Sequence, residues 1–207
     1  MFFFAGHFSN AQSYRFGISG GGGASFLNGD HILTGFNKHT FSYSAGLHGI
    51  ASFGDIEVKL QLFYEAKGDG YEFIVSPPDQ PEFDSDKAQS VRRYSYITIP
   101  LVVSYRFGSS KNFGVGLGPY AAFLNEHKIT TTIGSQEYVF GSAEDWNSFD
   151  MGLSLAVDYR YGLTKNWFLT AEATGNLGLI DMYKENSLDY NMYNQNYLLS
   201  LGVQYAL

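Results

Sequence analysis

Residues 56–66 read IEVKLQLFYEA, and apolar and mostly polar side chains alternate along this segment. A repeat of two puts successive side chains on opposite faces of an extended chain, so the segment predicts a β-strand rather than a helix. The same repeat occurs at residues 150–161 (DMGLSLAVDYRY) and 197–207 (YLLSLGVQYAL). Each run has about ten residues or more, the length that a tilted strand needs to cross the hydrocarbon core of a membrane.

The connections between the predicted strands alternate between long and short. Five further strands are predicted at residues 14–25, 40–52, 92–107, 113–126 and 167–177. Gly, Ser, Asn and Asp favour tight hairpin turns at residues 53–55, 108–112 and 162–166. The other connections are too long and polar for turns, at residues 26–39, 67–91, 127–149 and 178–194. This pattern predicts an all-β fold, an eight-stranded antiparallel up-and-down transmembrane β-barrel in an outer membrane, with extracellular long loops and both termini in the periplasm.

Alternation alone does not say which face points outward, because a soluble lipocalin-like barrel has the same period with its apolar face inside. Two features of composition favour the membrane barrel. The face opposite the apolar one is rich in Gly, Ser, Ala and Thr with isolated charges of both signs, as a narrow filled lumen requires. Aromatic residues make up 17% of the chain and gather near the strand ends, as in girdles at headgroup depth.

The N-terminus is the third feature that favours an outer membrane. Phe2, Phe3 and Phe4 are apolar, and residues 9–11 before Gln12 have the small-x-small form of a signal-peptidase site. A disordered tail is the alternative interpretation. We therefore expect residues 1–11 to be a residual signal peptide or a disordered tail, and residues 12–207 to form one outer-membrane β-barrel domain.

Composition excludes several other classes. The net charge of −7 argues against nucleic-acid binding, which depends on basic patches. The absence of cysteine removes disulfides and Cys-based zinc sites. Asp84, Ser85 and Asp86 could offer oxygen ligands to Ca²⁺, but a solvated acidic loop is the simpler interpretation. No cofactor and no metal site are predicted.

Three segments resemble a known family. They are residues 94–101 (YSYITIPL), 104–107 (SYRF) and 113–120 (FGVGLGPY), which resemble the central hairpin of the PorT-like outer-membrane β-barrel proteins of Bacteroidota. The resemblance implies an outer-membrane barrel and, from the member that names the family, an association with protein secretion across that membrane.

Charged residues at lumen-facing positions form the first candidate site. Strand parity points eight of them inward: Arg15, Glu57, Lys59, Glu65, Arg106, Asp158, Arg160 and Glu172. Four are basic and four acidic, and an eight-stranded barrel encloses little more than its own side chains. We expect a salt-bridged polar core that seals the barrel, since unpaired buried charges are costly. An ion path or a proton relay is the alternative.

The last long loop is the second candidate site. It mixes Met182, Tyr183, Tyr190, Met192 and Tyr193 with Asn and Asp, which is typical of surfaces that bind other proteins. Alternatively, some of these tyrosines extend the outer aromatic girdle.

Catalytic residues are not evident in the sequence. His127 at the outer rim and His48 on the lumen face lack a serine that parity and height clearly bring close. We therefore expect no enzymatic activity. The predicted function is that of a surface or envelope interaction protein, with outer-membrane lipid around the barrel and a possible protein partner at the extracellular loops. An accessory role in secretion is the leading alternative, followed by a lipid-modifying enzyme and a small pore.

Overall fold

The computed structural model describes residues 12–29, 39–75, 86–141, 146–182 and 191–207. Its strands are β1 (Gln12–Gly29), β2 (Thr40–Phe53), β3 (Ile56–Val75), β4 (Asp86–Phe107), β5 (Phe113–Ile133), β6 (Gln136–Phe140), β7 (Phe149–Gly162), β8 (Trp167–Gly178) and β9 (Met192–Ala206). Among these residues no helix has the length and apolar character needed to span a membrane.

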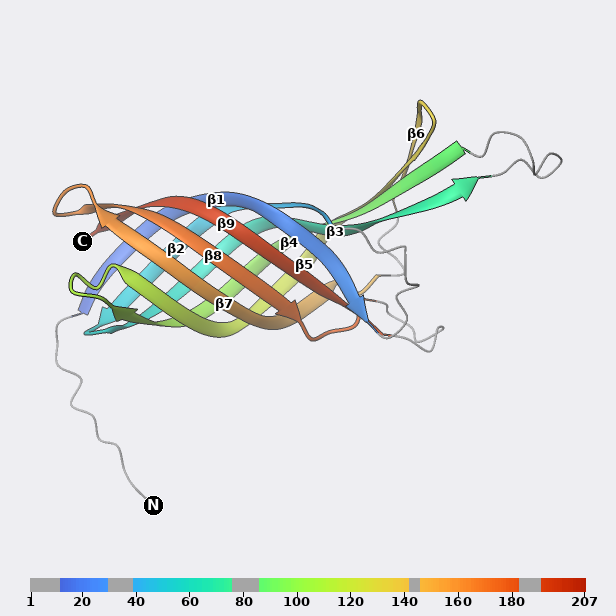
Figure 1. Ribbon diagram of the computed structural model, residues 1–207. Helices are drawn as coiled ribbons and strands as arrows, with labels where there is room; N and C mark the ends of the chain where they lie inside the picture. The colour runs from blue at the N-terminus through green and yellow to red at the C-terminus, as the bar shows by residue number, and fades with distance from the viewer. Residues whose placement is uncertain (1–11, 30–38, 76–85, 142–145, 183–190) are drawn as a thin grey trace, which may run out of the picture.

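The nine strands form one antiparallel sheet that closes into a ring. Eight of them make the barrel wall in the order β1, β2, β3, β4, β5, β7, β8 and β9, and β9 pairs with β1 to close it (Figure 1). The ninth strand, β6, pairs with the end of β5 and stands outside the ring. The predicted eight-stranded barrel is therefore confirmed, with one short strand that the sequence analysis did not anticipate.

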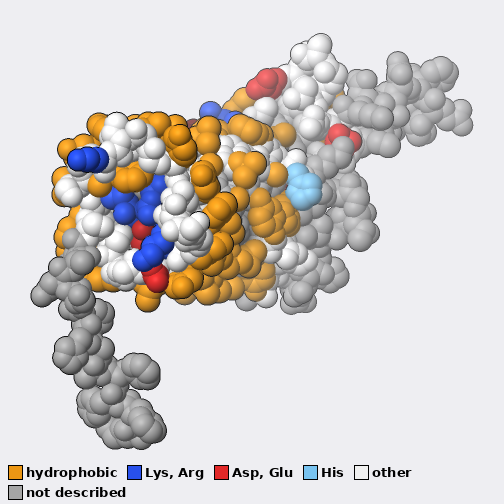
Figure 2. Space-filling view, turned by 60° about the vertical axis from the view of Figure 1, so that its left-hand side comes forward, with side chains coloured by type: hydrophobic (Ala, Val, Ile, Leu, Met, Phe, Trp, Pro, Cys, Tyr) orange, Lys and Arg blue, Asp and Glu red, His pale blue; other side chains and the backbone are white. Residues whose placement is uncertain are grey.

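Apolar side chains cover the outside of the barrel. Leu199 and Leu201 are each 72% exposed, and Leu153 and Leu155 of β7 also point outward. In Figure 2 hydrophobic side chains form a broad band over the visible face of the barrel, while charged side chains gather inside its open end. The alternative lipocalin-like arrangement, with the apolar face inside, is thereby excluded, because this surface suits a hydrocarbon surrounding.

Three tight turns lie at one end of the barrel, together with the beginning of β1 and the end of β9 (Figure 1). Two of these turns need glycine, since Gly54 and Gly108 have φ angles of +66° and +87°. This end is called the short-turn end, and the opposite end the long-loop end.

Two predicted loops are largely β-strand, which corrects their assignment. In the connection 67–91, β3 continues to Val75 and β4 begins at Asp86. In the connection 127–149, β5 continues to Ile133 and is followed by β6. The alternation was hidden in β3 because the positions of outward parity carry Gly68, Gly70 and Glu72 rather than apolar side chains.

The extended strands leave the barrel as a four-stranded sheet. This projecting sheet consists of residues 68–75 of β3, 86–94 of β4, 127–133 of β5 and all of β6. It extends beyond the long-loop end in Figure 1. A register shift lies where it joins the wall, as Ser95 pairs with Glu126 and Tyr96 with Leu124, so one residue of β5 bulges out.

Candidate functional site

At the short-turn end of the lumen, three arginines surround one carboxylate. Glu57 receives hydrogen bonds from Arg15 at 2.5 Å, Arg106 at 2.7 Å and Arg160 at 3.0 Å. Arg106 also forms an ion pair with Asp158 at 2.6 Å. Period-two alternation on β1, β3, β4 and β7 points these five predicted residues into the lumen, and strand register brings them to one level. Their mutual pairing offsets the loss of hydration.

In the middle of the lumen, an ion pair joins Lys59 of β3 to Glu172 of β8. Gln61 donates a hydrogen bond to the same carboxylate at 3.5 Å. The neighbouring void measures about 10 Å³, which is the size of about one water molecule. A second void of about 20 Å³ lies above it, next to Glu65 and Asn176. Within the described residues, side chains thus fill this part of the lumen.

Glu65, the eighth predicted charge, lies in a separate polar layer nearer the long-loop end. It accepts hydrogen bonds from Thr98 at 2.8 Å and from Asn196 at 2.5 Å. Its cationic neighbour is Lys67 at 3.3 Å, and Lys67 lies 3.6 Å from Asp150. Neither Lys67 nor Asp150 was among the predicted lumen charges. Residue 67 was assigned to a loop although it has the parity of Glu65, and Asp150 stands at the first position of its predicted strand.

Lys67 is also enclosed by aromatic rings. Its Nζ atom lies 4.8 Å from the ring centroid of Tyr120 and 5.2 Å from that of Tyr96. The Tyr120 hydroxyl donates to Asp150 at 3.2 Å, and Asn194 donates to the same oxygen at 3.2 Å. A buried ammonium is therefore held by two carboxylates and two ring faces.

An apolar plug closes the long-loop end above this layer. Its buried members are Leu27, Tyr94, Tyr96, Tyr120, Ala122, Trp146, Met182 and Met192. Trp146 packs on Tyr94 and on His127, with ring centroids 4.9 Å and 5.0 Å apart. The Met182 sulfur accepts a hydrogen bond from Asn194 at 2.8 Å. Connections between strands, rather than strands alone, thus seal the mouth.

Two of the five residues predicted to form a loop binding surface are buried instead of exposed. Met182 is 1% exposed and Met192 is 9% exposed, so both belong to the plug rather than to the surface. Their apolar side chains fill the mouth because that removes them from water. Tyr193 is half-buried in β9. Tyr183 and Tyr190 lie outside the described residues.

The two histidines singled out in the sequence are both buried. His127 stacks on Tyr94 with ring centroids 4.8 Å apart, inside the plug. His48 has a serine neighbour after all, since the Ser19 hydroxyl lies 3.4 Å from His48 Nδ1. This contact corrects the expectation that no serine is close, although the adjacent void of about 10 Å³ holds no more than a water molecule.

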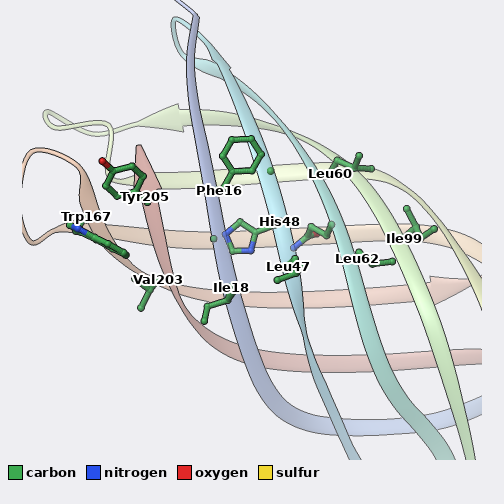
Figure 3. A pocket seen from close by; sticks show the side chains of 13 residues that line it. Phe16, Ile18, Leu47, His48, Leu60, Leu62, Ile99, Trp167, Val203 and Tyr205 are labelled. Carbon is green, nitrogen blue, oxygen red and sulfur yellow. The ribbon is translucent and has the colours of Figure 1, made fainter. Parts of the chain in front are cut away.

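Two shallow grooves mark the outer apolar surface. The larger measures about 710 Å³ and crosses β1, β2 and β3 near the short-turn end. Figure 3 shows Phe16 and Ile18 near its middle, between Trp167 on one side and Leu60 and Leu62 on the other. The second groove, of about 600 Å³, lies over glycines of β1 and β8. Both belong to the band that faces hydrocarbon.

Arg92 of the projecting sheet also contacts the plug. Arg92 forms two hydrogen bonds with Asp69, at 2.9 Å and 2.5 Å. Its guanidinium also lies over the rings of Tyr71 and Trp146, at 5.5 Å and 5.8 Å from their centroids. The base of the sheet is thereby fixed to the barrel mouth, while β6 lies at the free side.

Comparisons with known proteins agree with this architecture. The family model described as outer membrane protein beta-barrel domain matches residues 10–184. No curated protein matches the chain. Similar solved structures include Neisserial surface protein A (NspA), which is 15% identical over 92% of this chain and 96% of that chain, with a TM-score of 0.40. Another is Ail, the attachment invasion locus protein of Yersinia pestis, 12% identical over 93% of this chain and 98% of that chain, with a TM-score of 0.43.

One comparison corrects the expectation that the chain has no enzymatic activity. The outer membrane protease OmpT from Escherichia coli is 14% identical over 94% of this chain and 97% of that chain, with a TM-score of 0.41. A barrel similar to this one is therefore an enzyme, and barrel architecture does not exclude activity. A likeness at this score assigns no activity either, so the enzymatic status of the chain is not established.

Proposed function

Since the chain belongs to the outer membrane protein beta-barrel domain family, we propose that it is an outer-membrane protein that binds partners at its long-loop end, on the cell surface. In this orientation the three tight turns and both chain ends lie in the periplasm. The usual arrangement of such barrels, with short periplasmic turns and longer extracellular loops, supports the proposal.

The observation that carries this proposal is the filled lumen. Ion pairs occupy its short-turn end and middle, and an apolar plug closes its long-loop end. The two voids among these layers hold about 20 and 10 Å³, which is room for about one water molecule each. Among the residues that the structure describes, side chains leave no path for a solute through the barrel. Binding of a partner therefore takes place on the outside of the barrel, where the projecting sheet offers exposed side chains such as Tyr138 and Phe140.

Two kinds of partner follow from the surface. Outer-membrane lipid contacts the apolar band, including the groove of Figure 3. A protein partner contacts the long-loop end, where Tyr193 offers an amphipathic ring of the kind that is common in interfaces. Membership of the PorT-like proteins of Bacteroidota, and with it an accessory role in secretion, is a second candidate. The resemblance of residues 94–101 and 113–120 supports it, and a sealed lumen suits an accessory better than a conduit.

Photo-crosslinking on intact cells tests the proposal. A benzoylphenylalanine replaces the half-buried Tyr193 at the long-loop end or the exposed Leu163 at the short-turn end, because the two positions lie at opposite ends of the same barrel. We expect covalent adducts with surface or secretion components from position 193, and adducts with periplasmic components from position 163. Surface adducts from position 163, or equal adduct patterns from both positions, would overturn the proposal. Identification of a secretion component in the adduct would favour the accessory role.

A further inference from the structure

The free edge of β6 is the feature of the projecting sheet that calls for a partner. In the part of the chain that the structure describes, β6 pairs with β5 on one side and with no strand on the other. An open edge presents unpaired backbone N–H and C=O groups. Lysine, proline and bulges are common protections of such edges, and β6 has none of them: it reads QEYVF, with one acid, and pairs without interruption from Gln136 to Phe140.

The turn determines which backbone groups point to the free edge. Gly134, with a φ of +59°, and one further residue connect β5 to β6, so Ile133 and Gln136 are the first pair. In such a hairpin the first pair exchanges hydrogen bonds, and hydrogen-bonded and non-hydrogen-bonded pairs then alternate. Tyr138 therefore bonds to Thr131 of β5. The N–H and C=O groups of Glu137 and Val139 point away from β5, toward the open side.

The side chains of β6 place exposed aromatic and apolar groups and one acid beside this edge. Tyr138, Val139 and Phe140 are 43%, 55% and 58% exposed, although all three are favoured in strands. The Tyr138 hydroxyl donates to Gln136 at 2.6 Å, which holds the ring along one face of the sheet. Glu137 carries the only charge of β6 and lies with Val139 on the opposite face. The edge thus offers two backbone donors and two acceptors, flanked by aromatic rings on one face and by one acid on the other.

We propose that β6 accepts an extended polypeptide segment of a partner protein as an added antiparallel strand. The partner needs a basic residue opposite Glu137, because opposite charges directly across a ladder attract. It needs an aromatic or β-branched residue opposite Tyr138, since this would be a non-hydrogen-bonded pair, in which side chains approach more closely. The inference rests on the proposed function, because a foreign strand reaches β6 only if the long-loop end is outside the cell. Addition of a strand to a sheet edge is a general mode of peptide recognition.

The test uses the full chain in lipid nanodiscs and a fluorescent peptide with blocked ends, Ser-Thr-Val-Tyr-Lys-Thr-Ser. Two variants change the same position in different ways. Val139→Pro removes the N–H that points to the open side and keeps the ladder to β5, whereas Val139→Thr keeps that N–H and changes the side chain. We expect peptide binding by fluorescence anisotropy, about tenfold weaker for Val139→Pro and within about twofold of the parent for Val139→Thr.

Hydrogen exchange on the same samples provides the second measurement. We expect the peptide to slow amide exchange at Glu137 and Val139, while exchange at Tyr138, already bonded to β5, changes little. Exchange at Tyr138 also shows whether the hairpin survives in Val139→Pro. The inference is overturned by an absence of binding to the parent protein, by equal loss in both variants, or by amides at Glu137 and Val139 that are already protected without peptide.

A third measurement separates this inference from the proposed function. The same peptide is added to intact cells that carry the parent protein or Val139→Pro. Labelling of cells with the parent alone supports both proposals. Binding in nanodiscs without labelling of intact cells would support the edge-strand inference but overturn the proposed orientation. Absence of binding in nanodiscs would overturn the inference and leave the crosslinking test of the orientation unaffected.

Discussion

Lys59 and Glu172 form an ion pair across the barrel, from β3 to β8, two strands that are not neighbours in the sheet. Both side chains are removed from water, with 6% and 14% of their surface exposed. Most contacts in a barrel run between adjacent strands, but this one joins distant parts of the wall. Its energetic role can therefore be separated from strand pairing.

The first prediction concerns this cross-barrel pair. Lys59→Ala should lower the free energy of unfolding by about 3–5 kcal/mol, because it leaves a buried carboxylate without its cation. Urea denaturation in detergent or lipid measures the change. Lys128→Ala is the matched control, since the Lys128–Glu126 pair is about half exposed and should contribute about 0–1 kcal/mol. Similar small losses of unfolding free energy in both variants would show that water solvates the charges in the lumen.

The second prediction concerns the lipid-facing band. Leu201 lies midway between Tyr197 and Tyr205, the outward aromatic residues near the two ends of β9. Leu201→Arg should destabilise the barrel by about 2–4 kcal/mol, because it places a charge near the membrane midplane. Leu207→Arg, at the chain end beyond Tyr205, should cost about 0–1 kcal/mol. Equal costs at the two positions would contradict the depth assignment.

The third prediction concerns transport. In planar bilayers the purified protein should show no steady conductance, because ion pairs and an apolar plug fill the lumen. A general porin in the same bilayers serves as the positive control. Reproducible single-channel steps from this chain would instead support the alternative that the protein is a small pore.

The fourth prediction concerns orientation. A broad-specificity protease added to intact cells should cut the long connections, within residues 67–91 or 127–149, and spare the turn at 108–112. Cleavage should concentrate where the chain is not paired, since paired strands resist proteolysis. After the outer membrane is permeabilised, the turn at 108–112 should also become accessible. Cleavage at this turn first, in intact cells, would show that the proposed membrane orientation is reversed.

Much of the wall could be predicted because a repeat of two assigns each side chain to a face. Glu57, Lys59 and Glu65 were placed in the lumen by parity alone, and the structure puts all three there. The face to which a side chain points does not, however, identify the charged residue with which it pairs. That Glu57 meets three arginines from other strands depends on register and barrel closure, which no local pattern records.

The long-loop end was predicted less well, for two physical reasons. Strands that leave the membrane no longer need an apolar outer face, so residues 67–75 and 127–133 lost the contrast that marks a membrane strand. A signal for β6 was nevertheless present in TTIGSQEYVF, where a two-residue turn with glycine separates alternating segments. Met182 and Trp146 could not be placed from the sequence, because loops carry them into the mouth and the path of a loop is decided by tertiary packing.

The pairing of β1 with β9 joins the first and last strands of the barrel. The ring therefore cannot close until β9 has arrived, and a sheet without β9 has two open sides. Arg15 and Glu57 come from early strands and can pair before closure, whereas the Lys59–Glu172 pair joins β3 to β8 across the lumen and is complete only when the sheet curves into a ring. Until then the same side chains can stay hydrated along the inside of an open, curved sheet. The order of events lets the cell assemble a charged interior in a membrane without moving a lone charge through hydrocarbon.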